Sequence, residues 1–494
     1  MGDRRTPRVV IVGAGMSGIC MGIKLKQAGI ETFTIYEKAA EVGGTWRDNT
    51  YPGLACDVPS RYYSYSFEPN PDWSRYYSPG HEIQDYFRQV ADRHGVRSHI
   101  RFDTEVERAS FEGGRWQITT RAGETEEADF IVSAAGVLRE VRYPDIQGLD
   151  SFEGAAFHSA RWDHDVELRG RRIGVIGCGS TGVQLMCALP EIANHVTSFQ
   201  RTPQWVFPMP NPRYSKLTRR LMRRVPALNR VAYRGWQRYF EFMGRGMVEP
   251  GFHRTTADLI CRLHLRTVRD PELRRKLTPE DVPMCKRLIF SGRFYKAMQR
   301  PNVDLVTERI ERVEPRGVVT ADGVLHEVDV LVLATGYHAH TYMRPMELIG
   351  PGGVTLEEAW RDGPHSYRSV ALPGFPNFFM LQGPHSPFGN QSIVTVAESQ
   401  TDYVLRFVQM FAEGRFDAAE PTAEATARYN DELRAALPNT VWTTGCKSWF
   451  LGKNGLPELW PWRPERHREM LREVALEEFD LTTAPELEPV ATAS

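Results

Sequence analysis

The stretch Val9-Val10-Ile11-Val12-Gly13-Ala14-Gly15-Met16-Ser17-Gly18 decides the fold of this chain, since it reads as an apolar strand, a glycine-rich turn and the start of a helix. The same order returns in Ile173-Gly174-Val175-Ile176-Gly177-Cys178-Gly179-Ser180-Thr181-Gly182. Such glycines allow a tight bend and a close approach to a pyrophosphate, and the helix N-terminus offers N–H groups to the phosphates. One motif of this kind is weak evidence, but two predict an α/β fold with two Rossmann-like dinucleotide-binding domains. We expect cofactor contacts at Gly13, Gly15, Ser17, Gly18, Gly177, Gly179, Ser180, Thr181 and Gly182.

The residue at the end of the strand that follows each turn distinguishes the two sites. Glu37 lies about 20 residues past the first turn, where a carboxylate accepts hydrogen bonds from ribose hydroxyls, so we predict FAD there. The corresponding strand of the second unit, Val196–Thr202, has no acid and carries Arg201. A guanidinium pairs well with the 2′-phosphate of NADPH, so we predict that cofactor at the second site. The plainer alternative for Arg201 is a solvated surface arginine.

Length and composition set outer limits on the function. A chain of 494 residues with 41% hydrophobic residues suggests two or three domains with substantial cores. The formal net charge of -1 gives no global reason to expect binding to nucleic acid. The seven cysteines form no CxxC pair, no zinc spacing and no disulfide framework, so we expect ordinary thiols in a reducing cytoplasm. The sequence has no 18-residue apolar stretch and no HExxH spacing, and we predict neither a membrane span nor a metal.

The chain is predicted to leave its first domain and return to it. We assign residues 1–145 and 339–494 to the FAD-binding domain, the second part including a C-terminal loop and tail. Residues 146–210 and 284–338 form the NADP-binding domain, and residues 211–283 a helical lid inserted into it. Similar strands close the two units: Asp129–Gly136 in the first part of the FAD-binding domain and Val328–Gly336 in the second part of the NADP-binding domain.

The first half of the insert is unusually basic. Its basic residues are separated by leucine, tyrosine, tryptophan and phenylalanine. They are Arg213, Lys216, Arg219, Arg220, Arg223, Arg224, Arg230, Arg234 and Arg238. One interpretation is a helix that touches a lipid surface or an anionic substrate. The other, which we favour on sequence grounds, is a solvated helical lid whose long side chains cover apolar surface.

A signature between the two turns suggests a family. Residues Phe152 to Asp163 match the pattern FxGxxxHxxxW(P/D), with Phe152, Gly154, His158, Trp162 and Asp163 at the defining positions. Together with both turns, this stretch resembles the single-component, NADPH-using, flavin-dependent Baeyer–Villiger monooxygenases, within the wider flavin-containing monooxygenases. The resemblance extends over nearly the whole chain and implies an enzyme with FAD and NADPH as cofactors.

The resemblance also implies roles for single residues. It places flavin contacts in the loop that holds Gly44, Thr45, Trp46, Asp57 and Tyr63, where glycine lets the backbone approach a cofactor and Trp46 offers a flat apolar face. It implies NADP contacts at Arg201, Thr202, Lys286 and Trp449. For His158, which lies between the two nucleotide-binding units, we expect a role in orienting the linker rather than in proton transfer.

Arg287 and Asp57 are the catalytic candidates that the resemblance gives. In this family reduced flavin reacts with oxygen to form a C4a-peroxyflavin, which attacks a ketone to give a tetrahedral, Criegee-type adduct and then an ester or lactone. An arginine stays charged at any working pH, so Arg287 can stabilise the peroxide and the adduct, with Asp57 holding the guanidinium in place. The expected partners are therefore molecular oxygen and a small ketone.

Three other functions stay open. An N- or S-oxygenase would use the same cofactors on amines or sulfides. A flavin disulfide reductase shares the tandem architecture but needs a redox-active cysteine pair. A sensor or scaffold would bind nucleotides without turnover. The identity of the ketone and the oligomeric state cannot be predicted from these residues.

Overall fold

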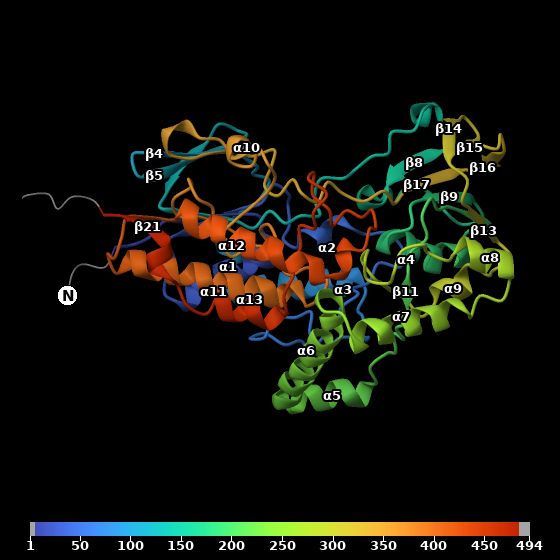
Figure 1. Cartoon of the computed structure of the whole chain (residues 1–494), viewed down its shortest axis with the longest axis horizontal. Helices are drawn as coiled ribbons and strands as arrows, with labels where there is room; N and C mark the ends of the chain where they lie inside the picture. Colours follow the sequence, from blue (N-terminus) through green and yellow to red (C-terminus); the bar gives the residue numbers. More distant parts are fainter. Residues whose placement is uncertain (1–4, 484–494) are drawn as a thin grey trace, which may run out of the picture.

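The computed structural model describes residues 5–483. Two parallel five-stranded sheets form its framework, one near each end of the elongated molecule (Figure 1). The first sheet has the order β19-β7-β1-β2-β3. Its strands are β1 (Val9–Val12), β2 (Phe33–Tyr36), β3 (Ile100–Arg101), β7 (Phe130–Ser133) and β19 (Phe378–Met380).

The second sheet has the order β13-β10-β9-β17-β8, and all its neighbouring strands pair in parallel. Its strands are β8 (Ala155–His158), β9 (Arg172–Ile176), β10 (His195–Phe199), β13 (Val303–Val306) and β17 (Val330–Leu333). The central strands β9 and β17 are buried Ile, Val and Leu runs, as expected for parallel strands covered on both faces. These two sheets confirm the predicted α/β fold class.

Each glycine turn joins the central strand of its sheet to a helix. Helix α1 (Met16–Gln27) follows β1, and helix α4 (Ser180–Ala188) follows β9. Helix α11 (Ile393–Ala412) packs along α1, and both contribute to the largest apolar core. Strand β19 brings the chain back to the first sheet after the second sheet is complete. The exact domain boundaries remain predictions.

Smaller elements surround the two sheets. Outside the insert, the α-helices not yet described are α2 (Thr45–Asp48), α3 (Gly80–Arg93), α9 (Phe294–Ala297), α10 (Leu356–Ala359), α12 (Ala423–Ala436) and α13 (Pro464–Met470). The remaining strands are β4 (Val106–Glu112), β5 (Arg115–Thr120), β6 (Thr125–Ala128), β11 (Val206–Phe207), β12 (Ile289–Phe290), β14 (Ile310–Glu314), β15 (Gly317–Thr320), β16 (Leu325–Glu327), β18 (Glu347–Ile349), β20 (Ala418–Pro421) and β21 (Phe479–Thr482).

Residues 211–283 contain helices α5 (Lys216–Arg224), α6 (Pro226–Val248), α7 (Phe252–Leu265) and α8 (Pro271–Lys276). Helix α7 packs against α6 and against strand β11, whereas α5 projects from the lower edge of the molecule (Figure 1). Within residues 5–483, no helix is both long enough and apolar enough to cross a bilayer.

The prediction that all seven cysteines are thiols is wrong for two of them. Cys285 and Cys446 form a disulfide although 161 residues separate them in the sequence. Local spacing cannot reveal such a pair, because only the fold brings the segment before Lys286 next to the C-terminal loop. The other five cysteines are free.

Candidate active site

A cavity of about 1820 Å³ lies between the two sheets, and both glycine turns line it. Its volume exceeds the roughly 300–1,000 Å³ of a pocket for one drug-sized ligand. The cavity contains most of the residues that we predicted as cofactor contacts: Gly13, Gly15, Ser17, Glu37, Gly44, Thr45, Trp46, Asp57, Tyr63, Gly177, Gly179, Ser180, Thr181, Arg201, Thr202, Lys286 and Trp449. One space therefore joins the two sites that the sequence suggested separately.

The first turn is built as a phosphate-binding turn requires. Gly13 has a φ of +105°, and a Cβ there would lie 2.7 Å from the carbonyl oxygen of Ala134. A Cβ on Gly18 would lie 1.9 Å from the carbonyl oxygen of Gly13, so Gly18 lies behind the turn and allows the helix to pack closely. Glycine is thus needed at both positions for different reasons: backbone conformation at Gly13 and helix packing at Gly18.

Glu37 sits at the carboxyl end of β2, facing this turn. Its carboxylate accepts hydrogen bonds from the backbone N–H groups of Ala14 at 2.9 Å and Ala39 at 3.0 Å, and it pairs with Arg47 at 3.0 Å. Only 5% of the residue is exposed. The carboxylate is therefore fixed in orientation before any ligand binds.

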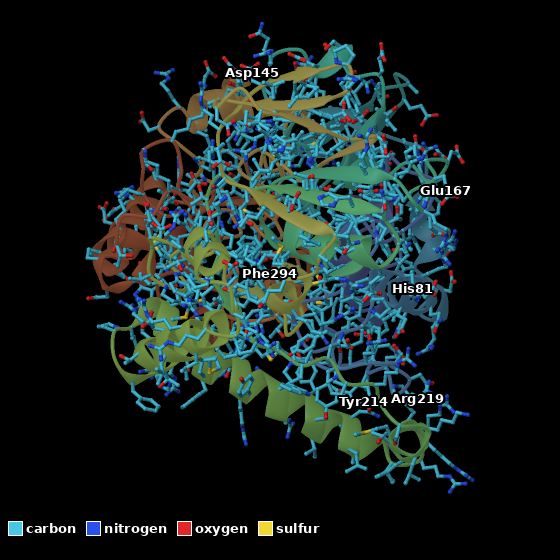
Figure 2. All side chains as sticks on the ribbon, turned by 90° about the vertical axis from the view of Figure 1, so that its right-hand side faces the viewer. His81, Asp145, Glu167, Tyr214, Arg219 and Phe294 are labelled. Carbon is cyan, nitrogen blue, oxygen red and sulfur yellow. A yellow bond between two sulfur atoms is a disulfide. The ribbon has the colours of Figure 1, made fainter. Side chains whose placement is uncertain are left out.

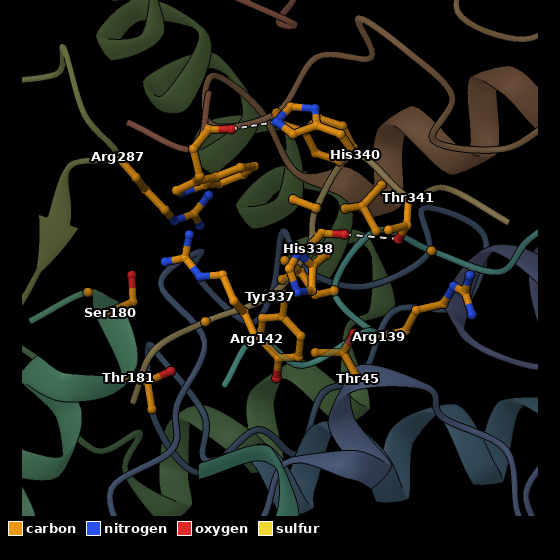
Figure 3. Close-up of a pocket in the computed structure, with 18 of the residues that line it drawn as sticks. Thr45, Arg139, Arg142, Ser180, Thr181, Arg287, Tyr337, His338, His340 and Thr341 are labelled. Atoms are coloured by element: carbon orange, nitrogen blue, oxygen red, sulfur yellow. Dashed lines mark hydrogen bonds between the residues drawn. The ribbon is translucent and has the colours of Figure 1, made fainter. Parts of the chain in front are cut away.

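The second turn repeats the same design. Gly177 has a φ of +119°, and a Cβ on Gly182 would lie 2.2 Å from the carbonyl oxygen of Gly177. Gly179 is different, because a Cβ added there would meet nothing within 4 Å. The backbone at Gly179 thus borders open space, and Ser180 and Thr181 project toward the cavity from the start of α4 (Figure 3). Arg201 follows β10 and is exposed, in contrast to buried Glu37.

An aromatic pair and an ion pair lie deeper in the cavity. The indole N–H of Trp46 donates to the Tyr63 hydroxyl at 3.0 Å, and the two rings meet edge to face. A guanidinium nitrogen of Arg287 lies 2.5 Å from a carboxylate oxygen of Asp57. The negative charge of Asp57 raises the pKa of Arg287 against the opposing effect of burial. The guanidinium is thus a permanent positive charge inside the cavity.

The C-terminal loop closes one side of the cavity. Trp449 lies in this loop, and its carbonyl oxygen is 2.7 Å from Nε2 of His340, a residue labelled in Figure 3. The Nδ1 atom of His340 pairs with Glu458. Burial lowers the pKa of His340. The hydrogen bond and charge of Glu458, together with the Trp449 carbonyl, outweigh this effect, so the pKa lies above its ordinary value. Lys286 forms an ion pair with Asp281. The Cys285–Cys446 disulfide ties the Lys286 segment to the loop of Trp449.

The signature residues lie outside the cavity. Phe152 packs in an apolar cluster under the second sheet, and Gly154 is needed because a Cβ would lie 2.4 Å from the carbonyl oxygen of Asp329. His158 is fully buried at the end of edge strand β8, and its Nδ1 accepts a hydrogen bond from the N–H of Ala160 at 3.1 Å. Burial lowers its pKa. Trp162 packs on Phe157.

Asp163, the last residue of the signature, is exposed and accepts a hydrogen bond from the N–H of Asp165 at 2.9 Å. The signature therefore shapes the edge of the second sheet and the segment leaving it. None of its five defining residues lines the cavity.

Sequence reasoning missed several polar residues that line the cavity. Arg142, Tyr337 and His338 contribute to its wall, and Figure 3 shows Arg142 projecting inward. The Tyr337 hydroxyl donates to Asn49 Oδ1 at 2.9 Å, a contact between segments 288 residues apart. The signal for Tyr337 and His338 was their place just after β17, since ligands bind at the carboxyl ends of parallel strands.

Known proteins resemble the chain over nearly its full length. A family model described as pyridine nucleotide-disulphide oxidoreductase matches residues 10–232. The chain is 56% identical over 477 residues to an uncharacterized monooxygenase of Mycobacterium tuberculosis, covering 97% of this chain and 96% of the relative. It is 39% identical over 485 residues to a Baeyer–Villiger monooxygenase of Streptomyces coelicolor, covering 96% and 92%.

Other similarities concern a solved structure and a different substrate chemistry. The structure of a cyclohexanone monooxygenase from Rhodococcus sp. Phi1 bound to NADP⁺ superposes with a TM-score of 0.87 at 30% identity, covering 97% of this chain and 99% of that one. A phenazine N-monooxygenase of Lysobacter antibioticus is 34% identical over 492 residues, covering 90% of each chain.

Proposed function

The chain belongs to the Baeyer–Villiger monooxygenase family, and we propose that it uses NADPH and molecular oxygen to convert ketones into esters or lactones. The observation that carries this proposal is the Arg287–Asp57 ion pair, which faces a cavity lined by two dinucleotide-type glycine turns. A permanent cation in such a place suits a reaction in which negative charge develops on oxygen.

FAD fits the first site and NADPH the second. Glu37 presents a fixed carboxylate for ribose hydroxyls, and Gly44, Thr45, Trp46 and Tyr63 line the adjoining wall. The open space in front of Gly179 leaves room for a pyrophosphate at the start of α4. We assign Arg201 and Thr202 to the 2′-phosphate, joined by Lys286 once its ion pair with Asp281 is shared or released.

Arg287 and Asp57 perform the chemistry that belongs to the protein itself. Bound flavin supplies the transfer of electrons from NADPH to oxygen. Arg287 then stabilises negative charge on the oxygen that is added to the ketone, and Asp57 fixes the direction of the guanidinium. The route through a peroxyflavin and a tetrahedral adduct stays a prediction.

Heteroatom oxygenation is the second candidate, and the similarity to a phenazine N-monooxygenase favours it. It would use the same cofactors and need no cation beside the reacting oxygen. Disulfide reduction fits poorly, because neither Cys285 nor Cys446 lines the cavity. The described cavity wall includes two free cysteines, Cys56 and Cys178, and burial raises the pKa of both thiols, that of Cys56 well above the usual value.

The remaining roles belong to the same proposal. The signature residues, His158 among them, position the segment between the two units, since they support the second sheet rather than the cavity. A reducing, cytoplasmic setting also remains a proposal, and the Cys285–Cys446 disulfide weighs against the thiol argument behind it.

The test is a substrate panel with the purified flavin-loaded protein. Cyclic, linear and aryl ketones, tertiary amines and sulfides are each added with NADPH, and NADPH consumption, hydrogen peroxide release and products are measured. The proposal predicts that ketones accelerate NADPH consumption and yield esters or lactones. Formation of only N-oxides or sulfoxides would replace it with heteroatom oxygenation.

A further inference from the structure

Helix α5 is an amphipathic helix with no buried residue. The Ser215 side chain caps it by accepting a hydrogen bond from the Thr218 N–H, and its final turn carries Arg223 and Arg224, which suit the negative end of the helix dipole. Pro226 then starts α6, so the chain turns sharply at Val225. Figure 2 shows the resulting projection at the bottom of the molecule, with Tyr214 and Arg219 near its base.

The surroundings of α5 are strongly cationic. Residues 211–240 contain nine lysines and arginines and no aspartate or glutamate, although the whole chain has a formal net charge of -1. Among these nine residues, the ion pairs found within residues 5–483 involve only Arg223, which contacts Asp72 at 2.6 Å. The positive charge is therefore left for an external partner.

Apolar side chains occupy the side of α5 that faces away from the protein. Leu217 is 76% exposed and Leu221 is 48% exposed, and the two lie one turn apart. Arg223 points toward the protein, where it forms its ion pair with Asp72, and the Nε atom of Arg219 is buried. At about 100° per residue, Leu221 lies roughly 160° around the helix from both arginines. Val225, which is 40% exposed, and Val231, which is 66% exposed, continue the apolar surface past the turn.

The order of side chains around α5 resembles that of helices that lie in a bilayer interface. Lys216, Arg220 and Arg224 lie between the inward arginines and the outward leucines. Long basic side chains in this place keep their charges at the level of lipid phosphates while neighbouring leucines enter the acyl region. We propose that α5 and the start of α6 dock this enzyme reversibly on an anionic lipid bilayer, lying in its surface without crossing it.

Two other partners fit less well. A nucleic acid would meet the leucines before the arginines, whereas phosphate backbones are bound by outward cations. Symmetric pairing of two copies through α5 would bring two clusters of like charge together, which is unfavourable. The sequence alone favoured a solvated lid, because it could not show that Leu217 and Leu221 point away from the protein.

The test is co-sedimentation of the full-length flavin-loaded protein with large vesicles. Neutral phosphatidylcholine vesicles are compared with vesicles that contain one quarter phosphatidylglycerol, at low and high salt. We expect binding to the anionic vesicles alone, reduced by salt. The double variant Leu217→Ser/Leu221→Ser should weaken binding by about tenfold or more, and Arg220→Gln/Arg224→Gln by about tenfold or more.

Matched controls come from exposed residues far from the insert. Val324→Ser/Val354→Ser removes two other exposed apolar side chains, and Arg361→Gln/Arg415→Gln removes equal charge. Both controls should bind like the unchanged protein, and all four variants should turn over a soluble substrate normally without vesicles. Failure of this proposal therefore leaves the proposed enzymatic function untouched.

Each contrary outcome overturns the docking proposal. Absence of binding to anionic vesicles contradicts it directly. Binding that survives the leucine changes shows charge attraction without insertion. Tighter binding to a single-stranded RNA than to vesicles assigns the surface to nucleic acid, and a change of oligomeric state in the leucine variant assigns it to a second copy.

Discussion

The two glycine turns share one backbone design but differ in what stands opposite them. Gly13 and Gly177 both have positive φ, and both motifs end in a glycine where a Cβ would collide with the turn. Opposite the first turn, Glu37 is buried and held by two backbone N–H groups and Arg47. Opposite the second, Arg201 is exposed. The first site is fixed in advance, and the second can rearrange.

This difference teaches how one fold can treat two similar ligands differently. A preorganised site loses little free energy to ordering when it binds, which suits a resident cofactor such as FAD. A site with an exposed, long side chain orders it on binding, which suits a cofactor that must leave and return. On the proposed assignment, the same turn would support retention of FAD in one unit and exchange of NADPH in the other.

The largest expected effect comes from the Arg287–Asp57 ion pair, which joins the two nucleotide-binding units. Arg287→Ala should lower the rate of ester or lactone formation roughly 10²–10³-fold or more, because it removes the cation beside the developing charge. Flavin content and NADPH-dependent flavin reduction should remain close to normal. The measurement is product formation by gas chromatography beside anaerobic flavin reduction. An unchanged product rate would remove Arg287 from the mechanism.

The glycines allow a sharper contrast. Gly13→Ala places a Cβ 2.7 Å from a carbonyl oxygen at a φ of +105°, so it should destabilise the protein by about 3 kcal/mol or more and abolish flavin retention. Gly179→Ala meets no atom and has a φ of -69°, so the fold should hold. Its methyl group should instead raise the dissociation constant for NADPH about tenfold.

Thermal unfolding and NADPH titration of both glycine variants decide this point. Equal loss of stability in the two variants would contradict the assignment of Gly179 to an open phosphate cradle.

Arg201 controls the choice of the second cofactor in this account. Arg201→Ala should raise the KM for NADPH by roughly tenfold or more, since a charge-assisted contact with phosphate is lost. The KM for NADH, which has no 2′-phosphate, should change little. Steady-state kinetics with both cofactors measure the ratio. An equal change in the KM for NADPH and for NADH would show that Arg201 is a solvated surface arginine without a contact to the 2′-phosphate.

The smallest expected effect is a pH dependence of the C-terminal loop. The pKa of His340 is raised in the fold, so its stabilising contacts with Glu458 and the Trp449 carbonyl are complete below the unfolded value of about 6.5 and are lost as pH rises through the folded pKa. The KM for NADPH should therefore rise a few fold toward alkaline pH.

His340→Gln, which cannot gain a charge, supplies the control for this pH profile. It should flatten the KM profile without shifting the pH dependence of flavin reduction at saturating NADPH. A profile identical to that of the unchanged protein would separate His340 from cofactor binding.

The sequence predicted what depends on short-range order. The two turns and Glu37 follow from residues close together in the chain, and the resemblance brought together Arg287 and Asp57, which the structure joins in an ion pair. Long-range contacts were beyond its reach. The Cys285–Cys446 disulfide and the Tyr337–Asn49 hydrogen bond both depend on loops that meet only in the folded chain. Which side of α5 faces outward was hidden for the same reason.

The most direct test of the central claim follows an oxygen atom. The flavin-loaded protein is supplied with NADPH, ¹⁸O₂ and a cyclic ketone, and the product is analysed by mass spectrometry. We predict a lactone that carries one ¹⁸O atom in its ring. Unchanged ketone with labelled hydrogen peroxide, or a lactone without label in its ring, would contradict the account.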